Sequence, residues 1–392
     1  MSETDFDQVI DRRGTFCGKW DAMETLFGVS PQDGLAMWVA DMDFLPPPAV
    51  NAALAQAVDH GIHGYYGPKT LYHDAIRGWM QRRHGWAVEE EWILTCHGLV
   101  SATGIAIQAF SAPGDGVILF TPVYHAFHKM IKANDREIVQ SPLVLEDGQY
   151  RMDLEALRGQ LSGRERIVIL CSPHNPGGRV WRRAEIAALA AFCAEHDLVL
   201  VSDEVHHDLT MPGQTHVIAT HAAPEHLDRI VVLSAASKTF GLAGGMCGQA
   251  IIPDPALRDR FSKPHIANGA SPNRFGIMMT EAAYTHGEDW LEALRLYLDG
   301  NRQLFDAGMA AIPGVASMPL EATYLAWVDF AGTGMDLPEV LERVEGRARI
   351  AANHGPEFGQ GGESFLRFNL AMPRARVAEA VSRLQEAFSD LQ

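Results

Sequence analysis

The fold is decided by a stretch that reads RIVIL over residues 166–170, RAEIAALAAFCAEH over residues 183–196 and LVLVS over residues 198–202. The first and last segments are short apolar runs, and the middle segment carries Ile186 and Leu189 at helical spacing. A strand, a helix and a second strand in this order predict an α/β fold, in which a mostly parallel sheet is covered by helices.

The same alternation extends in both directions along the chain. Residues 117–121 and 230–233 read as two further strands. After Gly287 a long helical pattern leads to the strand-like residues 324–330 and 365–370, and a helix over residues 376–388 closes the chain. We therefore expect three regions: an N-terminal arm that joins the small domain (residues 1–45), a large domain (46–285) and a small C-terminal domain (286–392).

Composition excludes several classes of protein. The 392 residues carry 49 acidic and 32 basic side chains, a formal net charge of −17, which repels nucleic acid and anionic membrane surfaces. No apolar run approaches the ~18 residues of a membrane span, and no signal-peptide pattern is present, so we expect a cytoplasmic protein. The five cysteines are scattered without a Cys-x-x-Cys pair, and we expect no structural metal site.

Asp203 follows one of the predicted strands directly. A carboxylate at the end of an apolar strand is costly unless it meets a cation or a polar partner, so Asp203 is a candidate for binding a protonated ring nitrogen. A residue that merely caps the following turn is the alternative. The next residues include His206 and His207, which would point to opposite faces of an extended segment and so disfavour a shared metal ion.

Lys238 stands among small and polar residues after the next predicted strand. A partly desolvated lysine has a lowered pKa, which an amine needs in order to react with an aldehyde. Taken alone, Lys238 also fits a solvated loop. Because the strands that lead to Asp203 and Lys238 are predicted neighbours, both side chains are expected in one crevice at the carboxyl edge of the sheet.

Three further patterns follow strands at this edge. Gly98 opens a helix whose free N–H groups could receive a phosphate, Tyr124 offers a flat face for a ring, and Asn175 lies in a rigid Asn-Pro-Gly turn. Each has an ordinary structural explanation when taken alone. Together with Asp203 and Lys238, they match the functional groups of pyridoxal 5′-phosphate.

These motifs occur in an order that resembles a known family. The sequence is similar to fold-type-I pyridoxal-phosphate enzymes of the aminotransferase class I/II group, and more closely to the MalY/PatB-type carbon–sulfur β-lyases. The resemblance runs nearly end to end, through KWD (19–21), MWVADMDF (37–44), TPVY (121–124), HNP (174–176), SDEVH (202–206), SKTF (237–240) and FLRFN (365–369). It implies a mostly parallel sheet of seven strands with a smaller α+β domain.

The resemblance also implies roles for individual residues. Lys238 would bond to the cofactor aldehyde and carry the substrate proton, Asp203 would hold the ring nitrogen, and Tyr124 would stack on the ring; these are the expected catalytic residues. The remaining cofactor contacts would come from Asn175 and His206 at the ring hydroxyl, Leu99, Val100 and Ser237 at the phosphate, and Tyr65 at the phosphate of the neighbouring subunit of a homodimer. Arg367 would bind the substrate α-carboxylate, with Trp38 and Asn175 beside it.

The expected activity is cleavage of L-cystathionine or a related cysteine S-conjugate to a thiol, pyruvate and ammonia. An aminotransferase is the first alternative, because both reactions use the same residues around the cofactor. A non-catalytic regulatory protein with the same fold is the second. The chain departs from common aminotransferase patterns at Ala235, where a phosphate-binding serine is frequent, and at residues 353–359, which bear on substrate choice.

Overall fold

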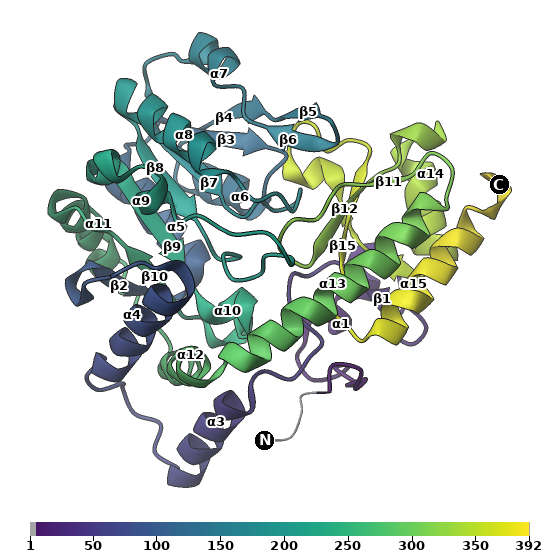
Figure 1. Ribbon diagram of the computed structural model, residues 1–392, viewed down its shortest axis with the longest axis horizontal. Helices are drawn as coiled ribbons and strands as arrows, with labels where there is room; N and C mark the ends of the chain where they lie inside the picture. Colours follow the sequence, from purple (N-terminus) through teal and green to yellow (C-terminus); the bar gives the residue numbers. More distant parts are fainter. Residues whose placement is uncertain (1–4, 392) are drawn as a thin grey trace.

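The computed structural model describes residues 5–391. Its centre is a seven-stranded sheet in which only β10 runs antiparallel to its neighbours (Figure 1). The strands lie in the order β2 (Ile93–Cys96), β10 (Gly248–Ile251), β9 (Ile230–Ser234), β8 (Val199–Asp203), β7 (Glu165–Cys171), β3 (Gly116–Thr121) and β4 (Glu137–Pro142). The predicted α/β fold with a mostly parallel sheet of seven strands is confirmed.

Helices cover both faces of this sheet, and the alternation of side chains along each strand supplies a core to both. On β7, Val168 and Leu170 pack into the core shared with α4 and α8, whereas Ile167 and Ile169 pack into the core shared with α5, α6 and α11. The helices of this part are α3 (Pro48–His60), α4 (Thr70–His84), α5 (Gly98–Phe110), α6 (Ala126–Ala133), α7 (Leu154–Gln160), α8 (Arg183–Glu195), α9 (Ala219–Ala222), α10 (Ala236–Thr239), α11 (Pro255–Ala267) and α12 (Arg274–His286).

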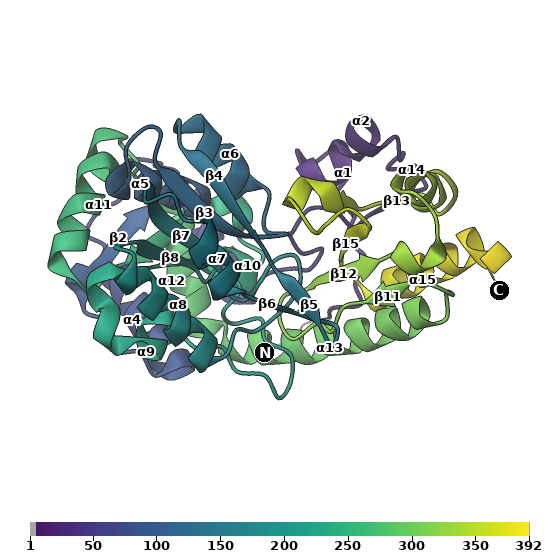
Figure 2. The ribbon, with the colours of Figure 1, turned by 90° about the horizontal axis from the view of Figure 1, so that it is seen from above.

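A second part of the molecule lies beside the large sheet (Figure 2). Its antiparallel sheet has the order β11-β12-β15-β14, and the helices α13 and α15 pack against each other with Gly308 close to Val381. The elements are α13 (Glu288–Ala310), β11 (Ala316–Ser317), β12 (Leu325–Asp329), α14 (Leu337–Leu341), β13 (Ile350–Ala351), β14 (Asn353–His354), β15 (Phe365–Asn369) and α15 (Arg374–Ala387). A small hairpin, β5 (Val144–Glu146) and β6 (Gln149–Arg151), belongs to neither sheet.

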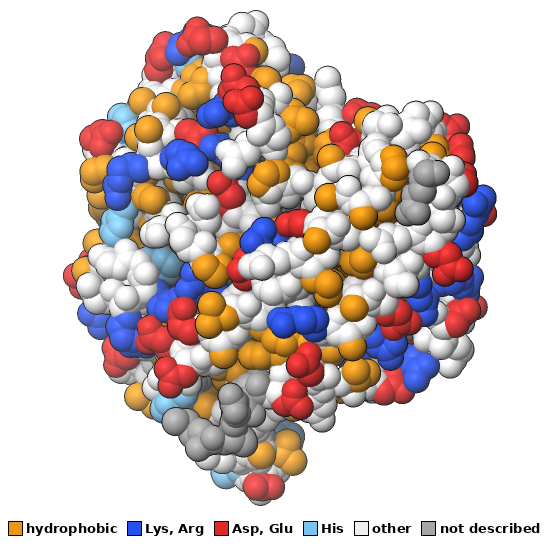
Figure 3. Space-filling view, turned by 45° about the vertical axis from the view of Figure 1, so that its right-hand side comes forward, with side chains coloured by type: hydrophobic (Ala, Val, Ile, Leu, Met, Phe, Trp, Pro, Cys, Tyr) orange, Lys and Arg blue, Asp and Glu red, His pale blue; other side chains and the backbone are white. Residues whose placement is uncertain are grey.

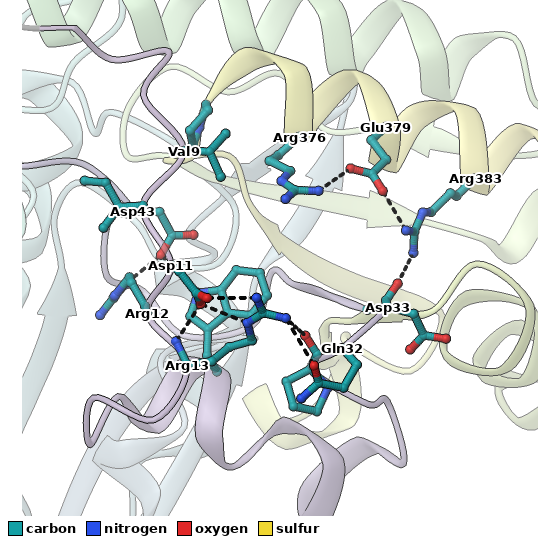
Figure 4. A pocket seen from close by; sticks show the side chains of 15 residues that line it. Val9, Asp11, Arg12, Arg13, Gln32, Asp33, Asp43, Arg376, Glu379 and Arg383 are labelled. Carbon is teal, nitrogen blue, oxygen red and sulfur yellow. Dashed lines mark hydrogen bonds and ion pairs between the residues drawn. The ribbon is translucent and has the colours of Figure 1, made fainter.

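The N-terminal segment packs onto this second part. It contains α1 (Gly18–Asp21), α2 (Met23–Phe27) and β1 (Leu35–Ala36), and β1 pairs in parallel with β13. Figure 4 shows a hydrogen bond across this contact, which Arg383 of α15 donates to the backbone oxygen of Asp33; the ion pairs Arg13–Asp11 and Arg383–Glu379 lie within the arm and within α15. This attachment supports an N-terminal arm that joins the small domain, and the division at residues 45 and 285 stays a proposal.

The charged side chains on the surface are consistent with the net negative charge of the sequence. On the face seen in Figure 3, acidic and basic side chains are interspersed, without a broad basic field. Within residues 5–391, no helix combines the length and the apolar character needed to cross a membrane.

Candidate active site

A cavity of about 150 Å³ opens at the carboxyl ends of β7, β8 and β9. This is the edge at which parallel α/β sheets bind ligands. The cavity is lined by every predicted cofactor residue except Tyr65, namely Leu99, Val100, Tyr124, Asn175, Asp203, His206, Ser237 and Lys238.

Asp203 ends β8 and is buried, with 6% of its surface exposed. Its Oδ1 accepts a hydrogen bond from the Val205 N–H at 3.1 Å, and no donor in residues 5–391 reaches its Oδ2. Burial raises the pKa of Asp203 to about 6, and the nearby charge of Lys238 opposes that rise. An approaching cation would therefore be bound strongly by this carboxylate.

Lys238 lies on the one-turn helix α10, which follows β9, the neighbour of β8 in the sheet. Its Nζ donates to the Ala40 carbonyl oxygen at 2.7 Å. Burial lowers the pKa of Lys238 to about 8, with Arg367 adding to this effect and Asp41 and Asp203 opposing it. A substantial fraction of the amine is consequently neutral near pH 8, as a nucleophile or a proton acceptor requires.

Two polar side chains form the wall next to Asp203. His206 is buried, and its Nδ1 has no hydrogen-bond partner among the described residues. Burial lowers the pKa of His206 well below its ordinary value, so the ring is neutral. Asn175 accepts from Arg367 through its Oδ1 and keeps its amide N–H₂ free for a ligand oxygen.

The N-terminus of α5 and Ser237 offer the cavity hydrogen-bond donors for an anion. The helix α5 begins at Gly98, whose φ is +74°, and no side chain caps it. Leu99 and Val100 therefore present unbonded backbone N–H groups at the positive end of the helix dipole. Ser237 contributes a hydroxyl group to the same cavity.

Arg367 enters the site from β15 of the small sheet, and it is 2% exposed. Its Nη1 donates to Asn175 Oδ1 at 2.9 Å, and its Nη2 donates to the Trp38 carbonyl oxygen at 2.7 Å and to Asn353 Oδ1 at 2.5 Å. Its Nε is buried without a partner. Burial lowers the pKa of Arg367 to about 10, which leaves it charged at neutral pH, and it lines a second cavity beside Lys238.

Sequence reasoning missed several residues that hold these groups in place. Asn353 lies opposite Arg367 in the register of β14 and β15, and Tyr324 donates to the same Ala40 oxygen that Lys238 contacts. Asn369 donates to the Val39 and Asp41 carbonyl oxygens at 2.6 Å. Two signals were available for Asn369: it lies two residues after Arg367, on the same face of a strand, and it ends the motif FLRFN (365–369).

The prediction that His206 and His207 lie on an extended segment is wrong. Residues 205–208 form a turn, which closes because His207 bonds the Glu204 carbonyl oxygen and its Nε2 lies 3.1 Å from Asp208 Oδ2. His207, His84 and Asp208 have potential metal-ligand atoms within 4.8 Å of one another. Trp79 and Thr239 also donate to Asp208, and the expected absence of a structural metal stays a prediction.

Tyr65 lies apart from the cavity. It belongs to the connection between α3 and α4 and is fully exposed. Within this single chain it contacts no group of the candidate site, so its predicted role depends on a second subunit.

The residues fit pyridoxal 5′-phosphate. The buried Asp203 suits a protonated ring nitrogen, the unpartnered His206 Nδ1 and the Asn175 amide suit a ring oxygen, and the open end of α5 suits a phosphate. Lys238, with its lowered pKa, suits the aldehyde.

Comparisons with known proteins agree with this site. The family model "Aminotransferase class I and II" matches residues 33–384. Cystathionine beta-lyase PatB of Bacillus subtilis is 40% identical over 98% of this chain and 100% of its own, and Protein MalY of Escherichia coli is 31% identical over 98% of each. The solved structure of cystalysin from Treponema denticola, which contains a pyridoxal 5′-phosphate cofactor, is 34% identical, with a TM-score of 0.95 over the whole of both chains.

Proposed function

The chain belongs to the class I and II aminotransferase family, and on that premise we propose that it is a pyridoxal 5′-phosphate-dependent carbon–sulfur β-lyase. Its substrates are L-cystathionine or related cysteine S-conjugates. Each conjugate takes up one water and yields a thiol, pyruvate and ammonia. The observation that carries the proposal is the convergence of buried Asp203, Lys238 with its lowered pKa, and Arg367 on one crevice, in a chain whose full-length relatives include cystathionine β-lyases.

Each residue of the site has a separate role in the proposed reaction. Arg367 binds the α-carboxylate of the substrate through its guanidinium group and so orients the α-hydrogen. Lys238, freed from the cofactor aldehyde by the substrate amine, removes the α-proton. Asp203 keeps the ring nitrogen protonated by its charge, and Tyr124 supports the ring. When bound, pyridoxal 5′-phosphate withdraws electrons from the substrate α-carbon, which allows the β-thiolate to leave.

Transamination is the second candidate, because the matching family model covers aminotransferases. In that reaction Lys238 returns the proton to the cofactor carbon, and the carbon–sulfur bond stays intact. The two activities are separated by incubating the holoenzyme with L-cystathionine and assaying the thiol and pyruvate. We expect equal amounts of both. Conversion of the cofactor to pyridoxamine phosphate without thiol would instead establish transamination.

We further infer that the protein acts in the cytoplasm as a homodimer. Tyr65 is fully exposed and Ile62 is 67% exposed, and both lie on the connection between α3 and α4. Burial of these apolar side chains in a subunit contact would stabilise a dimer. In such a dimer Tyr65 would reach the phosphate of the partner's cofactor. The net charge of −17 suits a soluble enzyme of the cytoplasm.

A further inference from the structure

Residues 38–43, which follow β1, form one wall of the crevice. Ala40 of this 38–43 segment lines both the cofactor cavity and the second cavity beside Lys238. The Ala40 carbonyl oxygen accepts a hydrogen bond from Lys238 Nζ at 2.7 Å, and the Trp38 carbonyl oxygen accepts one from Arg367 Nη2 at 2.7 Å. Backbone oxygens of the 38–43 segment therefore contact both cationic side chains of the proposed active site.

The Ala40 carbonyl oxygen lies where it can receive the Lys238 amine once the substrate has freed that amine from the cofactor aldehyde. A neutral amine that donates an N–H to this oxygen keeps its lone pair for the substrate α-proton. After the amine takes the proton, the same contact has a charged donor, which makes it roughly twice as strong. Tyr324 donates to the same oxygen at 3.0 Å, and burial raises the pKa of Tyr324, so its hydroxyl group stays a donor.

Four groups besides burial bear on the charge of the Lys238 amine. Burial lowers the pKa of Lys238 to about 8. Of the charged groups, Asp41 raises this pKa most, Arg367 lowers it, and Asp203 raises it less. His206 is neutral, because burial lowers its pKa well below the ordinary value. Since Asp203 holds the cofactor ring nitrogen in the proposed reaction, Asp41 is the carboxylate that remains to stabilise a protonated Lys238.

Two cations of the N-terminal arm bind the 38–43 segment. Arg12 forms ion pairs with Asp41 at 2.8 Å and with Asp43 at 2.7 Å, and the second pair is drawn in Figure 4. Lys19 is 1% exposed; its Nζ pairs with Asp43 at 2.9 Å and donates to the Asp41 carbonyl oxygen at 3.2 Å. A buried ion pair adds little net stability, because removing its charges from water offsets their attraction. Its main effect here is geometric, since it fixes the segment at Asp41 and Asp43.

A neighbouring ion pair of the arm does not reach this segment. Arg13 pairs with Asp11 at 2.8 Å, and the two side chains are 40% and 61% exposed. The other side-chain contacts of Arg13 are with Pro31 and Gln32, and within residues 5–391 neither member of the pair bonds to residues 38–43. Arg13 and Asp11 therefore supply matched controls for Arg12 and Asp41.

We propose that Asp41, Arg12 and Lys19 are positioning residues for Lys238. Arg12 and Lys19 hold the 38–43 segment so that the Ala40 carbonyl oxygen receives the freed amine, and the Asp41 carboxylate stabilises the charge that the amine gains. In the step that they assist, the α C–H bond breaks, its electron pair stays with the α-carbon, and the proton forms a bond to Lys238 Nζ. This role rests on the proposed function and deepens it, since it adds the groups that act on the proton carrier.

The first test needs no turnover. Cofactor-free protein is mixed with pyridoxal 5′-phosphate, and the rate at which borohydride can fix the cofactor to Lys238 is measured against pH. Only a neutral amine attacks the aldehyde, so the wild-type rate should rise with a midpoint near the Lys238 pKa of about 8. Asp41→Asn keeps the shape of the side chain and removes a charge that raises this pKa, so its midpoint should lie about 0.5–1 pH unit lower. Asp11→Asn should match wild type.

The second test follows proton removal in the holoenzyme, through pyruvate release from L-cystathionine that carries hydrogen or deuterium at the α-carbon. We expect Asp41→Asn and Arg12→Met to lower kcat about 3- to 10-fold, because a misplaced or less stabilised Lys238 takes the proton more slowly. The deuterium effect on kcat should be at least as large as in wild type. Asp11→Asn and Arg13→Met should keep kcat within about 2-fold of wild type.

An unshifted midpoint in Asp41→Asn, an equal shift in Asp11→Asn, or a lower kcat with a smaller deuterium effect would overturn the proposal. A loss of kcat in Arg13→Met as large as that in Arg12→Met would do the same. The proposed function fails separately: if the midpoints are as expected but wild type releases no pyruvate, the protein is not the lyase, and the action of Asp41 on Lys238 stands.

Discussion

Asp203 shows how a single residue can serve the reaction at the expense of stability. The carboxyl group is buried, and its pKa rises from the ordinary 3.8 to about 6, so the folded chain without cofactor binds a proton that the unfolded chain has released. Stability from this proton is fully present below pH 3.8 and is lost as pH rises through 6. At pH 8 Asp203 of the cofactor-free protein is a buried carboxylate with no protonated ring nitrogen beside it.

We therefore expect Asp203→Asn to raise the free energy of unfolding of the cofactor-free protein at pH 8 by up to about 3 kcal/mol, at about 1.4 kcal/mol per pKa unit. The gain should disappear near pH 4, and turnover of the holoenzyme should fall sharply. Urea denaturation at both pH values measures the difference. Asp208→Asn is the contrast: interactions with His207 and His84 hold the pKa of Asp208 well below its usual range, so this variant should destabilise the protein at pH 8. A destabilised Asp203→Asn protein at pH 8 would refute the account.

Arg367→Lys tests the carboxylate-binding role. Lysine keeps the charge but loses the planar fork that bonds Asn175, Asn353 and Trp38. We expect kcat/KM for L-cystathionine to fall by about 1.5–3 kcal/mol of transition-state stabilisation, while the absorption spectrum of the bound cofactor stays unchanged. Steady-state kinetics decide the point, and wild-type kinetics in the variant would exclude Arg367 from substrate binding.

Among individual residues, the sequence predicted as site residues those whose side chains directly follow apolar strands. Asp203 was recognisable because a carboxylate rarely ends such a strand without a partner. The family resemblance placed Trp38 and Asn175 beside Arg367, and both contact it. The contact with Asn353 was not foreseen, because the pairing of β14 with β15 brings it there. The turn at His207 escaped prediction for a similar reason: it depends on the position of Asp208 in the folded protein.

Among the elements, α12 and the short helix Ala243–Gly245 are packed unusually closely. A Cβ on Gly276 of α12 would lie 2.1 Å from the Gly245 carbonyl oxygen and 2.7 Å from Cys247 Cβ. The short helix follows α10, and Ala243 and Cys247 line the cofactor cavity. This close contact therefore holds one wall of the site in place.

Gly276→Ala should accordingly lower the free energy of unfolding by about 2–4 kcal/mol, because backbone atoms must move apart. It should also weaken cofactor binding. Gly104→Ala in α5 is the matched helical control, since nothing lies within 4 Å of its added Cβ, and it should be neutral or stabilising by up to about 1 kcal/mol. Urea denaturation and cofactor titration measure both variants. Equal stability in the two variants would contradict this reading of the contact.

Elements were predicted best where burial was complete. The runs at 166–170 and 198–202 correspond to β7 and β8 within one residue, because buried parallel strands are continuously apolar. The helix α10 was not predicted, since four residues are too few to show a helical period. The last helix begins at Arg374 rather than at the predicted 376, just after Pro373, which suits a helix start.

For the whole molecule, the proposed homodimer with shared sites predicts complementation between two inactive variants. In such a dimer each site takes Lys238 from one subunit and Tyr65 from the other. Lys238→Ala and Tyr65→Ala therefore remove residues that different subunits supply. A mixed dimer contains one site with an intact Lys238 and an intact Tyr65 from its partner. Equal coexpression should therefore restore about a quarter of wild-type activity, since half of the dimers are mixed and half of their sites are whole. A mixture no more active than its separate components would argue against shared sites.

The most direct test of the central claim compares wild type with Lys238→Ala. The account predicts that wild type releases pyruvate and homocysteine in equal amounts from L-cystathionine, and that borohydride fixes its cofactor to Lys238, as mass spectrometry of the peptides would show. Lys238→Ala should release neither product and retain no borohydride-fixed cofactor, because the nucleophile and the proton carrier are the same side chain. A Lys238→Ala protein that releases pyruvate at the wild-type rate would contradict the account.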